Sequence, residues 1–295
     1  MPRFLATLGV AIGILSASAA GQQSITTDEL INTLQRVGER VERFFLRAQS
    51  IVCVESVRLQ PLNAGLTTDG FARSVESELR LTWEPNSDPD KVPEAQAVRQ
   101  VMKVNGRPPK KNDHDNCTTP EQNATETQPL SMLLPGQREK YRFGYAGLGK
   151  LEGRNAIMLD YEEIKKVSVK VEEIPGNEDC ISYDIDGGMG GRVWIDPATY
   201  DVLRLDSRLK GLVDVRMPSK VSRRSGNSYW TVERFDTSIR FKPVSFQDPQ
   251  ETLILPISMS QMRITHGAGT PRLRTNTEYT NYRRFLTGAR IVPPQ

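Results

Sequence analysis

The sequence predicts an α+β protein that is mostly β, with a large curved antiparallel sheet, an incomplete barrel, packed against one long N-terminal amphipathic helix. Apolar residues recur at helical spacing only over residues 26–49, whereas apolar and polar residues alternate in many later segments. Gly, Pro, Asn and Asp separate these later segments, as in an antiparallel meander. We therefore expect one long helix followed by many strands.

The first twenty residues have the pattern of a secretory signal peptide. Arg3 precedes an apolar run from Phe4 to Leu15, and small residues follow at 17–19. The run is shorter than the roughly 20 apolar residues that span a bilayer, and no later stretch comes closer to that length. We expect residues 1–20 to be removed and the bacterial protein to be periplasmic or secreted, without a membrane span.

Residues 26–49 predict an amphipathic helix. Thr26 and Glu29, three residues later, form the pattern of a capping box. The opposite face mixes Arg and Glu side chains, so we expect the helix to cover the sheet and not to lie on a membrane surface. Its apolar stripe consists of Leu30, Leu34, Val37, Val41, Phe44 and Ala48.

Alternation with a period of two predicts half-buried strands. It is clearest over residues 71–83, and it returns over 166–173, 202–209 and 229–241. Over 71–83 the predicted apolar face consists of Phe71, Val75, Leu79, Leu81 and Trp83.

The glycine-rich stretch GGMGGRVWIDPATYDVLRLDSRL, residues 187–209, predicts a β-hairpin. Residues 192–196 form one expected strand, 197–200 the turn and 202–209 the returning strand. No helix N-terminus follows the glycines to receive a phosphate group. We therefore expect the glycines to bend the chain before the hairpin.

Three other patterns come close to ligand sites. Residues 144–151 (GYAGLGKL) resemble a phosphate-binding loop but end in Leu151 where a hydroxyl is needed. Residues 184–191 begin like a calcium loop, but Gly188 stands at a ligand position. His114 lies between two aspartates, and the only other histidine is His266. We expect turns and solvated side chains here, with no metal and no cofactor.

The sequence offers no established catalytic motif. Neither GxSxG nor HExxH occurs, and two isolated histidines leave little material for a catalytic triad. We therefore expect a protein that is not an enzyme. A hydrolase built on a pair of carboxylates is a less favoured alternative.

The charge balance and the expected loops limit the kinds of partner. The chain has 39 Lys and Arg against 36 Asp and Glu, a balance that gives no reason to expect a nucleic-acid partner. We expect residues 21–295 to form a single domain with polar insertions near 85–94 and 107–129. The densest basic cluster lies in an expected exposed loop and consists of Lys220, Arg223 and Arg224.

Three cysteines are an odd number for an oxidising compartment. Cys117 and Cys180 lie beside polar loops, whereas Cys53 lies inside the apolar stretch IVCVESV. We expect at most one disulfide, between Cys117 and Cys180, and a buried Cys53 that packs as a small apolar side chain.

Four stretches also carry a resemblance to a known group: IVCVESVRL, VNGRPPK, PLSMLLPGQREKYRFGYAGLGKLEGRNAIMLDYEE and GRVWIDPATYDVLRLDSRL. They resemble uncharacterised exported bacterial proteins, which in turn are similar to periplasmic lipoprotein carriers of the LolA/LolB kind. The resemblance implies a curved, incompletely closed antiparallel sheet around a helix layer, with a cavity that takes acyl chains. It brings no catalytic residue to this chain.

The first functional hypothesis is a non-enzymatic periplasmic binding or carrier protein for an acyl chain or a lipoprotein. In this hypothesis the loop with Lys220, Arg223 and Arg224 docks anionic head groups or an envelope protein partner. The alternative is an envelope protein interaction module whose core is packed shut. The expected lining of the cavity consists of Leu79, Leu81, Trp83, Val193, Ile195, Leu203, Leu205 and Phe235.

Overall fold

A computed structural model describes residues 26–48, 50–83, 92, 95–110, 113, 128–173, 181–247 and 250–284. The signal peptide, most of the two polar insertions, His114, Cys117, Cys180 and the side chain of Arg224 lie outside these residues. The elements, in chain order, are α1 (Thr27–Arg47), β1 (Ile51–Pro61), β2 (Arg73–Trp83), β3 (Ala95–Val104), the 3₁₀ helices η2 (Gln128–Leu133) and η3 (Pro135–Lys140), β4 (Tyr141–Leu151), β5 (Arg154–Glu163), β6 (Ser168–Glu173), β7 (Ile181–Asp186), β8 (Met189–Ile195), β9 (Val202–Leu209), β10 (Val213–Arg216), α2 (Ser219–Ser225), β11 (Tyr229–Gln247), β12 (Gln250–His266) and β13 (Arg272–Arg284).

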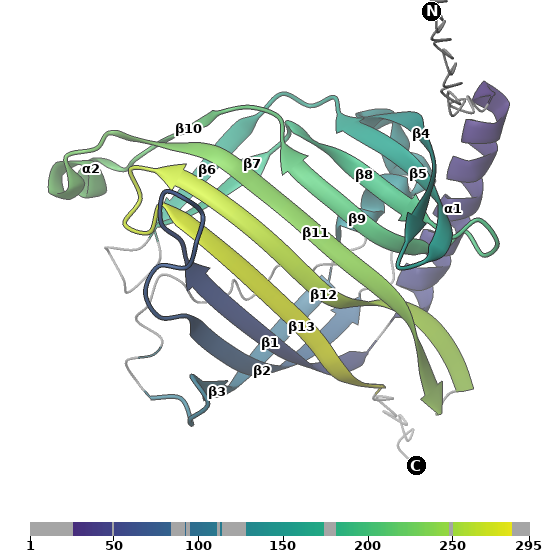
Figure 1. Ribbon diagram of the computed structural model, residues 1–295, viewed down its shortest axis with the longest axis horizontal. Helices are drawn as coiled ribbons and strands as arrows, with labels where there is room; N and C mark the ends of the chain where they lie inside the picture. The colour runs from purple at the N-terminus through teal and green to yellow at the C-terminus, as the bar shows by residue number, and fades with distance from the viewer. Residues whose placement is uncertain are drawn as a thin grey trace, which may run out of the picture.

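Eleven strands form one open antiparallel sheet in the order β3-β2-β1-β13-β12-β11-β9-β8-β5-β4, with β10 paired to β11 beside this path. The last strand, β13, lies between β1 and β12, so the first and last strands of the chain pair within the sheet (Figure 1). The prediction of a mostly β fold with a large, unclosed antiparallel sheet is confirmed.

Helix α1 lies behind one end of the sheet in Figure 1. Its first turn has the predicted capping box, since the Glu29 amide donates to Thr26 Oγ1 at 3.2 Å and the Thr26 amide donates to Glu29 Oε2 at 2.8 Å. The buried positions Val37, Val41 and Phe44 follow the predicted stripe. Among the helices that the structure describes, none is both long and apolar enough to cross a membrane.

The main core lies between α1, η2 and the covered face of the sheet. Strands from β2 at one side to β5 at the other contribute to this one apolar cluster, because the sheet curves around the helix layer. Phe45 of α1 packs edge-on against Trp83 of β2, with ring centroids 4.9 Å apart. Cys53 is fully buried, as predicted.

A second apolar cluster lies at the other end of the sheet. Leu209, Val215 and Val232 are buried there beneath the separate two-stranded sheet of β6 and β7. The predicted strand 166–173 is observed as β6, but Val167 remains exposed outside it.

The predicted hairpin is confirmed as β8 and β9, with Asp196 bonded to the backbone of the turn. The glycines divide between two roles. Gly187 and Gly188 have φ angles of 89° and 72° and form the bend, whereas Gly190 and Gly191 already belong to β8. A Cβ on Gly191 would lie 1.9 Å from the backbone oxygen of Asp206, so β9 approaches β8 too closely for a side chain.

Three local predictions were wrong. Phe71 does not join the apolar face of β2, because the strand begins at Arg73 and leaves Phe71 99% exposed. Residues 144–151 are not a turn: they lie within β4, where Gly147, at φ 103°, accommodates a bulge. The expected loop with Lys220 and Arg223 is the short helix α2, which ends at Gly226 in the left-handed conformation.

Candidate functional site

Six of the eight expected cavity-lining residues belong to the main packed core, and Leu203 and Phe235 lie outside it. Leu203 is also buried, whereas Phe235 is half-buried against the second cluster. Each of the six others is at most 6% exposed, and the main core brings them together: Leu79, Leu81, Trp83, Val193, Ile195 and Leu205. Their place as a ligand cavity stays a prediction, because they now contact α1, η2 and one another.

A small opening leads from the surface toward this core, between α1 and the sheet. We call it the helix crevice; its volume is about 80 Å³. Apolar side chains of α1, η2, β9 and β12 form its walls, and three arginines of α1 stand among them. The lining consists of Arg40, Val41, Arg43, Phe44, Arg47, Leu130, Asp201, Val202, Thr252, Leu253 and Ile254.

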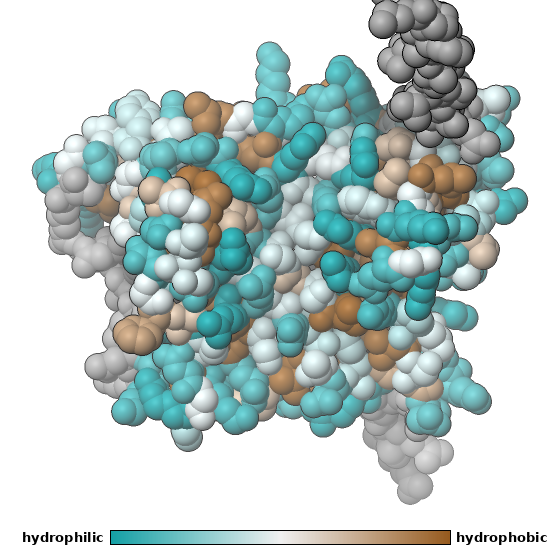
Figure 2. Space-filling view, viewed as in Figure 1, coloured by the Kyte–Doolittle hydropathy of each residue, from teal (hydrophilic) through white to brown (hydrophobic). Residues whose placement is uncertain are grey.

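The opposite face of the sheet carries a much larger depression, which we call the polar hollow. It has a volume of about 1110 Å³, and Figure 2 shows this face as mostly hydrophilic. Its floor is a row of paired residues that runs across the strands, from Asp160 through Arg192, Asp206 and Ser238 to Ser260. They alternate in sequence with buried residues such as Val193 and Leu205, which point to the core.

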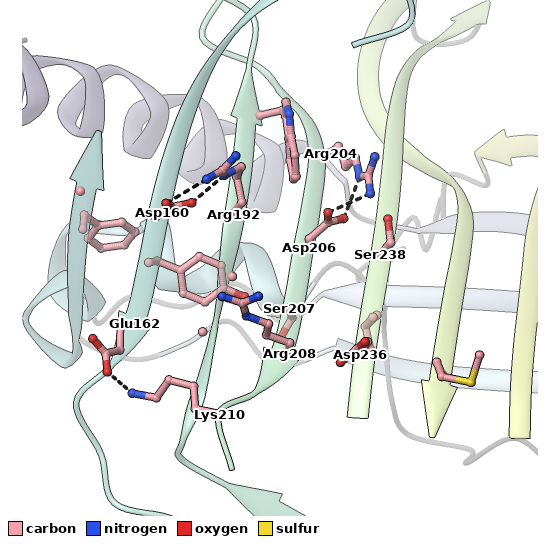
Figure 3. Close-up of a pocket in the computed structure, with 18 of the residues that line it drawn as sticks. Asp160, Glu162, Arg192, Arg204, Asp206, Ser207, Arg208, Lys210, Asp236 and Ser238 are labelled. Carbon is pink, nitrogen blue, oxygen red and sulfur yellow. Dashed lines mark hydrogen bonds and ion pairs between the residues drawn. The ribbon is translucent and has the colours of Figure 1, made fainter. Parts of the chain in front are cut away.

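Every acidic side chain that lines the polar hollow forms an ion pair, and Figure 3 marks those of Asp160, Asp206 and Glu162. Asp160 accepts two bonds from Arg192, at 2.6 and 3.0 Å, and Asp206 accepts two from Arg204, at 2.7 and 2.8 Å. Glu162 pairs with Lys210. The fourth pair joins Arg234 and Asp236 at 2.5 Å. These pairs fix the side chains in place and leave no acid of the hollow without a cation.

Two further arginines of the polar hollow are not members of these pairs, although Arg142 is the cross-strand partner of Glu162 and, after Lys210, helps to lower the pKa of that carboxyl group. Arg142 on β4 and Arg208 on β9 are exposed, and neither forms an ion pair with a described residue. Figure 3 shows the Arg208 side chain between the Glu162–Lys210 pair and Asp236. Gly190 lies between Glu162 and Arg208 in the strand register, and the stem of Lys210 packs over it, 3.3 Å from the place where a Cβ would stand.

An aromatic side chain borders the same floor. The guanidinium carbon of Arg204 lies 4.7 Å from the ring centroid of Trp194, and that of Arg192 lies 5.9 Å from it. The two cations therefore hold the indole at the edge of the hollow.

The electrostatics of the hollow favour binding over proton transfer. The bond from Lys210 lowers the pKa of Glu162, and the bond to Asp160 raises the pKa of Arg192, so these pairs stay ionised. Burial raises the pKa of Tyr161, on the core side of β5, to about 12. The lowered pKa of Glu162 keeps this carboxyl group ionised at neutral pH, which does not suit a general acid.

The remaining predicted site features do not gather into a site. Lys220 and Arg223 are exposed on α2. His266 contacts Glu233 at 2.5 Å on the surface. Within the described ranges, His, Cys, Asp and Glu side chains nowhere form a group of three or more that could hold a metal ion. The expected disulfide and the metal alternative at His114 lie outside these ranges.

The polar hollow is the feature that sequence reasoning missed. Its residues were recognisable only as the polar positions of alternating strands, which ordinarily face solvent. The signal that they form one surface is the strand order, in which β5 lies beside β8 and β9 lies beside β11.

No protein-family model and no curated protein matches the chain. Among solved structures it is similar to an outer membrane lipoprotein-sorting protein domain from Vibrio parahaemolyticus (14% identity, covering 88% of this chain and 94% of that one, TM-score 0.39). It is also similar to a DUF1329 family protein from Desulfovibrio piger (9%, 87% and 93%, TM-score 0.41) and to a LolA superfamily protein from Nitrosomonas europaea (8%, 85% and 93%, TM-score 0.32). The predicted resemblance to lipoprotein carriers thus has counterparts among solved structures. At these identities and TM-scores, function has to be argued from the surfaces of this chain itself.

Proposed function

We propose that this protein is a non-enzymatic binding protein of the bacterial cell envelope that takes up the acyl chain of a lipid or lipoprotein between α1 and the sheet. One observation carries the proposal: the helix crevice has apolar walls that continue into the core and arginines at its mouth. This combination suits an amphiphile with an apolar tail and an anionic head.

The walls of the crevice belong to the main core. Val41 and Phe44 of α1, Leu130 of η2 and Leu253 of β12 are each at most 9% exposed and are members of the same apolar cluster. An acyl chain that enters here would therefore replace contacts between apolar side chains with similar contacts, at little loss of buried apolar area.

The mouth of the crevice offers positive charge. Arg43 and Arg47 are exposed, and Arg43 uses only its Nε in a bond to the Glu39 carbonyl, at 3.1 Å. Arg40 donates its Nε to the Thr199 carbonyl at 2.7 Å and lies 3.6 Å from Asp201. The terminal guanidinium nitrogens of Arg43 and Arg47 can therefore meet a phosphate or carboxylate.

Uptake requires α1 to move outward. The crevice volume of about 80 Å³ is far below the roughly 300–1,000 Å³ of typical ligand pockets. Arg138 of η3 restrains this movement by donating to the Leu34 carbonyl at 2.5 Å and to the Leu133 carbonyl at 3.1 Å. Gly38 permits the contact, since a Cβ there would lie 2.0 Å from Arg138 Nη2.

Dense packing favours a second candidate, the envelope interaction module with a closed core. The six predicted lining residues in the main core are at most 6% exposed and already fill the interior. In this candidate α1 stays in place and a protein partner binds on the surface.

A fluorescent C16 fatty acid, titrated into the full mature chain, separates the two candidates. We expect saturable binding that is weakened about tenfold or more by Ile254→Trp, which fills the crevice. Leu148→Trp on β4, at a residue that is 59% exposed and not part of the crevice, should leave binding unchanged. Absence of saturable binding, or equal loss in both variants, would favour the closed module.

The arginines at the mouth of the helix crevice can be tested separately. Arg43→Glu with Arg47→Glu should weaken binding of the anionic fatty acid, whereas its uncharged methyl ester should be affected less. The matched control is Lys150→Glu with Arg154→Glu, which makes the same change in charge at exposed positions outside the crevice. An equal effect of both double variants would refute a role of the crevice arginines.

A further inference from the structure

We propose that the polar hollow, on the face of the sheet opposite α1, is a docking site for an extended acidic segment of a protein partner. This interaction is separate from acyl binding at the helix crevice, since none of the residues that line the hollow lines the crevice.

The charge left after internal pairing is positive. Six cations and four acids line the hollow, and the four acids pair with Arg192, Arg204, Lys210 and Arg234. Arg142 and Arg208 therefore carry guanidinium groups whose donors no described acid uses. Carboxylates fit such groups through paired, charge-assisted hydrogen bonds.

The polar surface continues beyond Arg208 across the sheet. A second depression of about 860 Å³ shares Arg204, Ser238 and Ser260 with the polar hollow, so the two are continuous. Arg58 on β1 lies in this second depression, is exposed, and again forms no ion pair with any residue that the structure describes. Three free arginines thus stand along one elongated surface.

Their spacing matches an extended polypeptide. Arg208 lies three strands from Arg142, and Arg58 lies four strands beyond Arg208. At about 4.8 Å between strands, these steps are roughly 14 and 19 Å. A segment of about ten residues in extended conformation, at about 3.3 Å per residue, reaches all three arginines.

The floor between the arginines is suited to a polypeptide backbone. Ser238, Ser260 and Asn276 are successive partners across β11, β12 and β13, and Ser260 donates to Asn276 Oδ1 at 3.0 Å. These groups can donate to and accept from peptide groups that cross them. The ring of Trp194 beside the floor offers a surface for one apolar side chain of the segment.

A recessed surface of mixed charge also favours an acidic polypeptide over other polyanions. The floor lies inside a depression, which a single extended segment can follow more closely than the plane of a bilayer can. Four paired acids line the same depression and would repel the closely spaced phosphates of a nucleic acid. A segment with a few separated carboxylates meets the free arginines without this repulsion.

Fluorescence anisotropy of labelled twelve-residue peptides tests the proposal with the full mature chain. We expect a Ser-rich peptide with three Glu residues, spaced by four and then six positions, to bind, and the matched peptide with Gln in place of Glu to bind at least tenfold more weakly. Arg142→Gln with Arg208→Gln should raise the Kd of the acidic peptide by about tenfold or more. Lys150→Gln with Arg154→Gln, which removes the same charge from exposed positions of β4 and β5 that line neither depression, should change it by less than about twofold.

Three outcomes would overturn the proposal. The first is equal affinity for the two peptides, and the second is an equal effect of the two double variants. The third is failure of the acidic peptide to bind while phosphatidylglycerol vesicles bind and lose affinity in Arg142→Gln with Arg208→Gln, which would assign the arginines to lipid phosphate. Ile254→Trp at the helix crevice should leave peptide affinity unchanged, so failure of the acyl-binding proposal is distinguishable from failure of this one.

Discussion

At the scale of single residues, Gly191 shows how a missing Cβ permits two strands to approach. It pairs with Ser207 in the β8–β9 ladder, where the backbone oxygen of Asp206 occupies the position that a side chain would take. Because that neighbour is backbone, it cannot move aside without breaking the pairing that positions Arg192 and Asp206 in the polar hollow.

We predict that Gly191→Ala lowers the free energy of unfolding by about 1–3 kcal/mol, the usual effect of overpacking. Gly144→Ala on β4 is the matched control, since a Cβ there would have no atom within 4 Å. It should change stability by less than about 0.5 kcal/mol. Urea unfolding followed by circular dichroism measures both, and equal midpoints would contradict the close approach.

Buried charge is the second feature at this scale. Glu55 of β1 accepts two bonds from Arg99 of β3, at 2.8 and 3.0 Å, and the side chains are only 2% and 6% exposed. A buried ion pair tolerates replacement of both partners far better than removal of one, because removal leaves an uncompensated charge.

We predict that Arg99→Met destabilises the protein by about 3–5 kcal/mol. Adding Glu55→Leu to it should recover most of this loss. The control is Lys103→Met on the same strand, which removes the partner of Glu76 from a pair that is 52% and 34% exposed and should cost less than about 1 kcal/mol. If Arg99→Met alone and Arg99→Met with Glu55→Leu lost the same amount of stability, the uncompensated charge of Glu55 would not be the cause of the loss.

At the scale of elements, local sequence signals predicted most of the structure. The capping box and apolar stripe predicted α1, and alternation predicted β2, β9 and the first part of β11. The sequence did not predict α2, because this helix has only seven residues and its polar sequence gives no apolar period. In β4 the glycines suggested a turn, but pairing with β5 along the whole strand outweighs their weak strand propensity.

The capping box makes a prediction for α1. Thr26→Ala removes the acceptor of the Glu29 amide and should lower the free energy of unfolding by about 1 kcal/mol. Thr27→Ala, at the exposed first residue of the helix, keeps the cap and should have little effect. Thermal unfolding followed at 222 nm compares the two, and an unchanged Tm for Thr26→Ala would mean that the start of α1 does not contribute to global stability.

At the scale of the whole molecule, strand order is what the sequence could not supply. Alternation identifies which residues of a strand face the core, but it does not say that β13 returns between β1 and β12. Six of the eight predicted lining residues lie in the main core, and their role in lining a cavity stays a prediction. The polar hollow could not be predicted, because it joins polar positions of strands far apart in the chain.

This strand order also makes the proposal of a single domain testable. Strands β9 and β11 contribute to both apolar clusters: Leu209 of β9 and Val232 of β11 lie in the second cluster, and Leu205 and Ile239 of the same strands lie in the main core. Neither cluster can lose its strands without disrupting the other, so we predict one cooperative unfolding transition. Two independent units would instead unfold at separate denaturant concentrations.

The three tryptophans report on different parts of this sheet. Trp83 lies in the main core, Trp194 beside the polar hollow, and Trp230 against the second cluster. Three variants can be made, each of which keeps one tryptophan and has Phe in place of the other two. In each variant, the urea midpoint measured by fluorescence should equal the midpoint measured by circular dichroism. An earlier fluorescence midpoint for Trp230 alone would mean that the end of the sheet beneath β6 and β7 unfolds independently, and that the second cluster is a unit of its own.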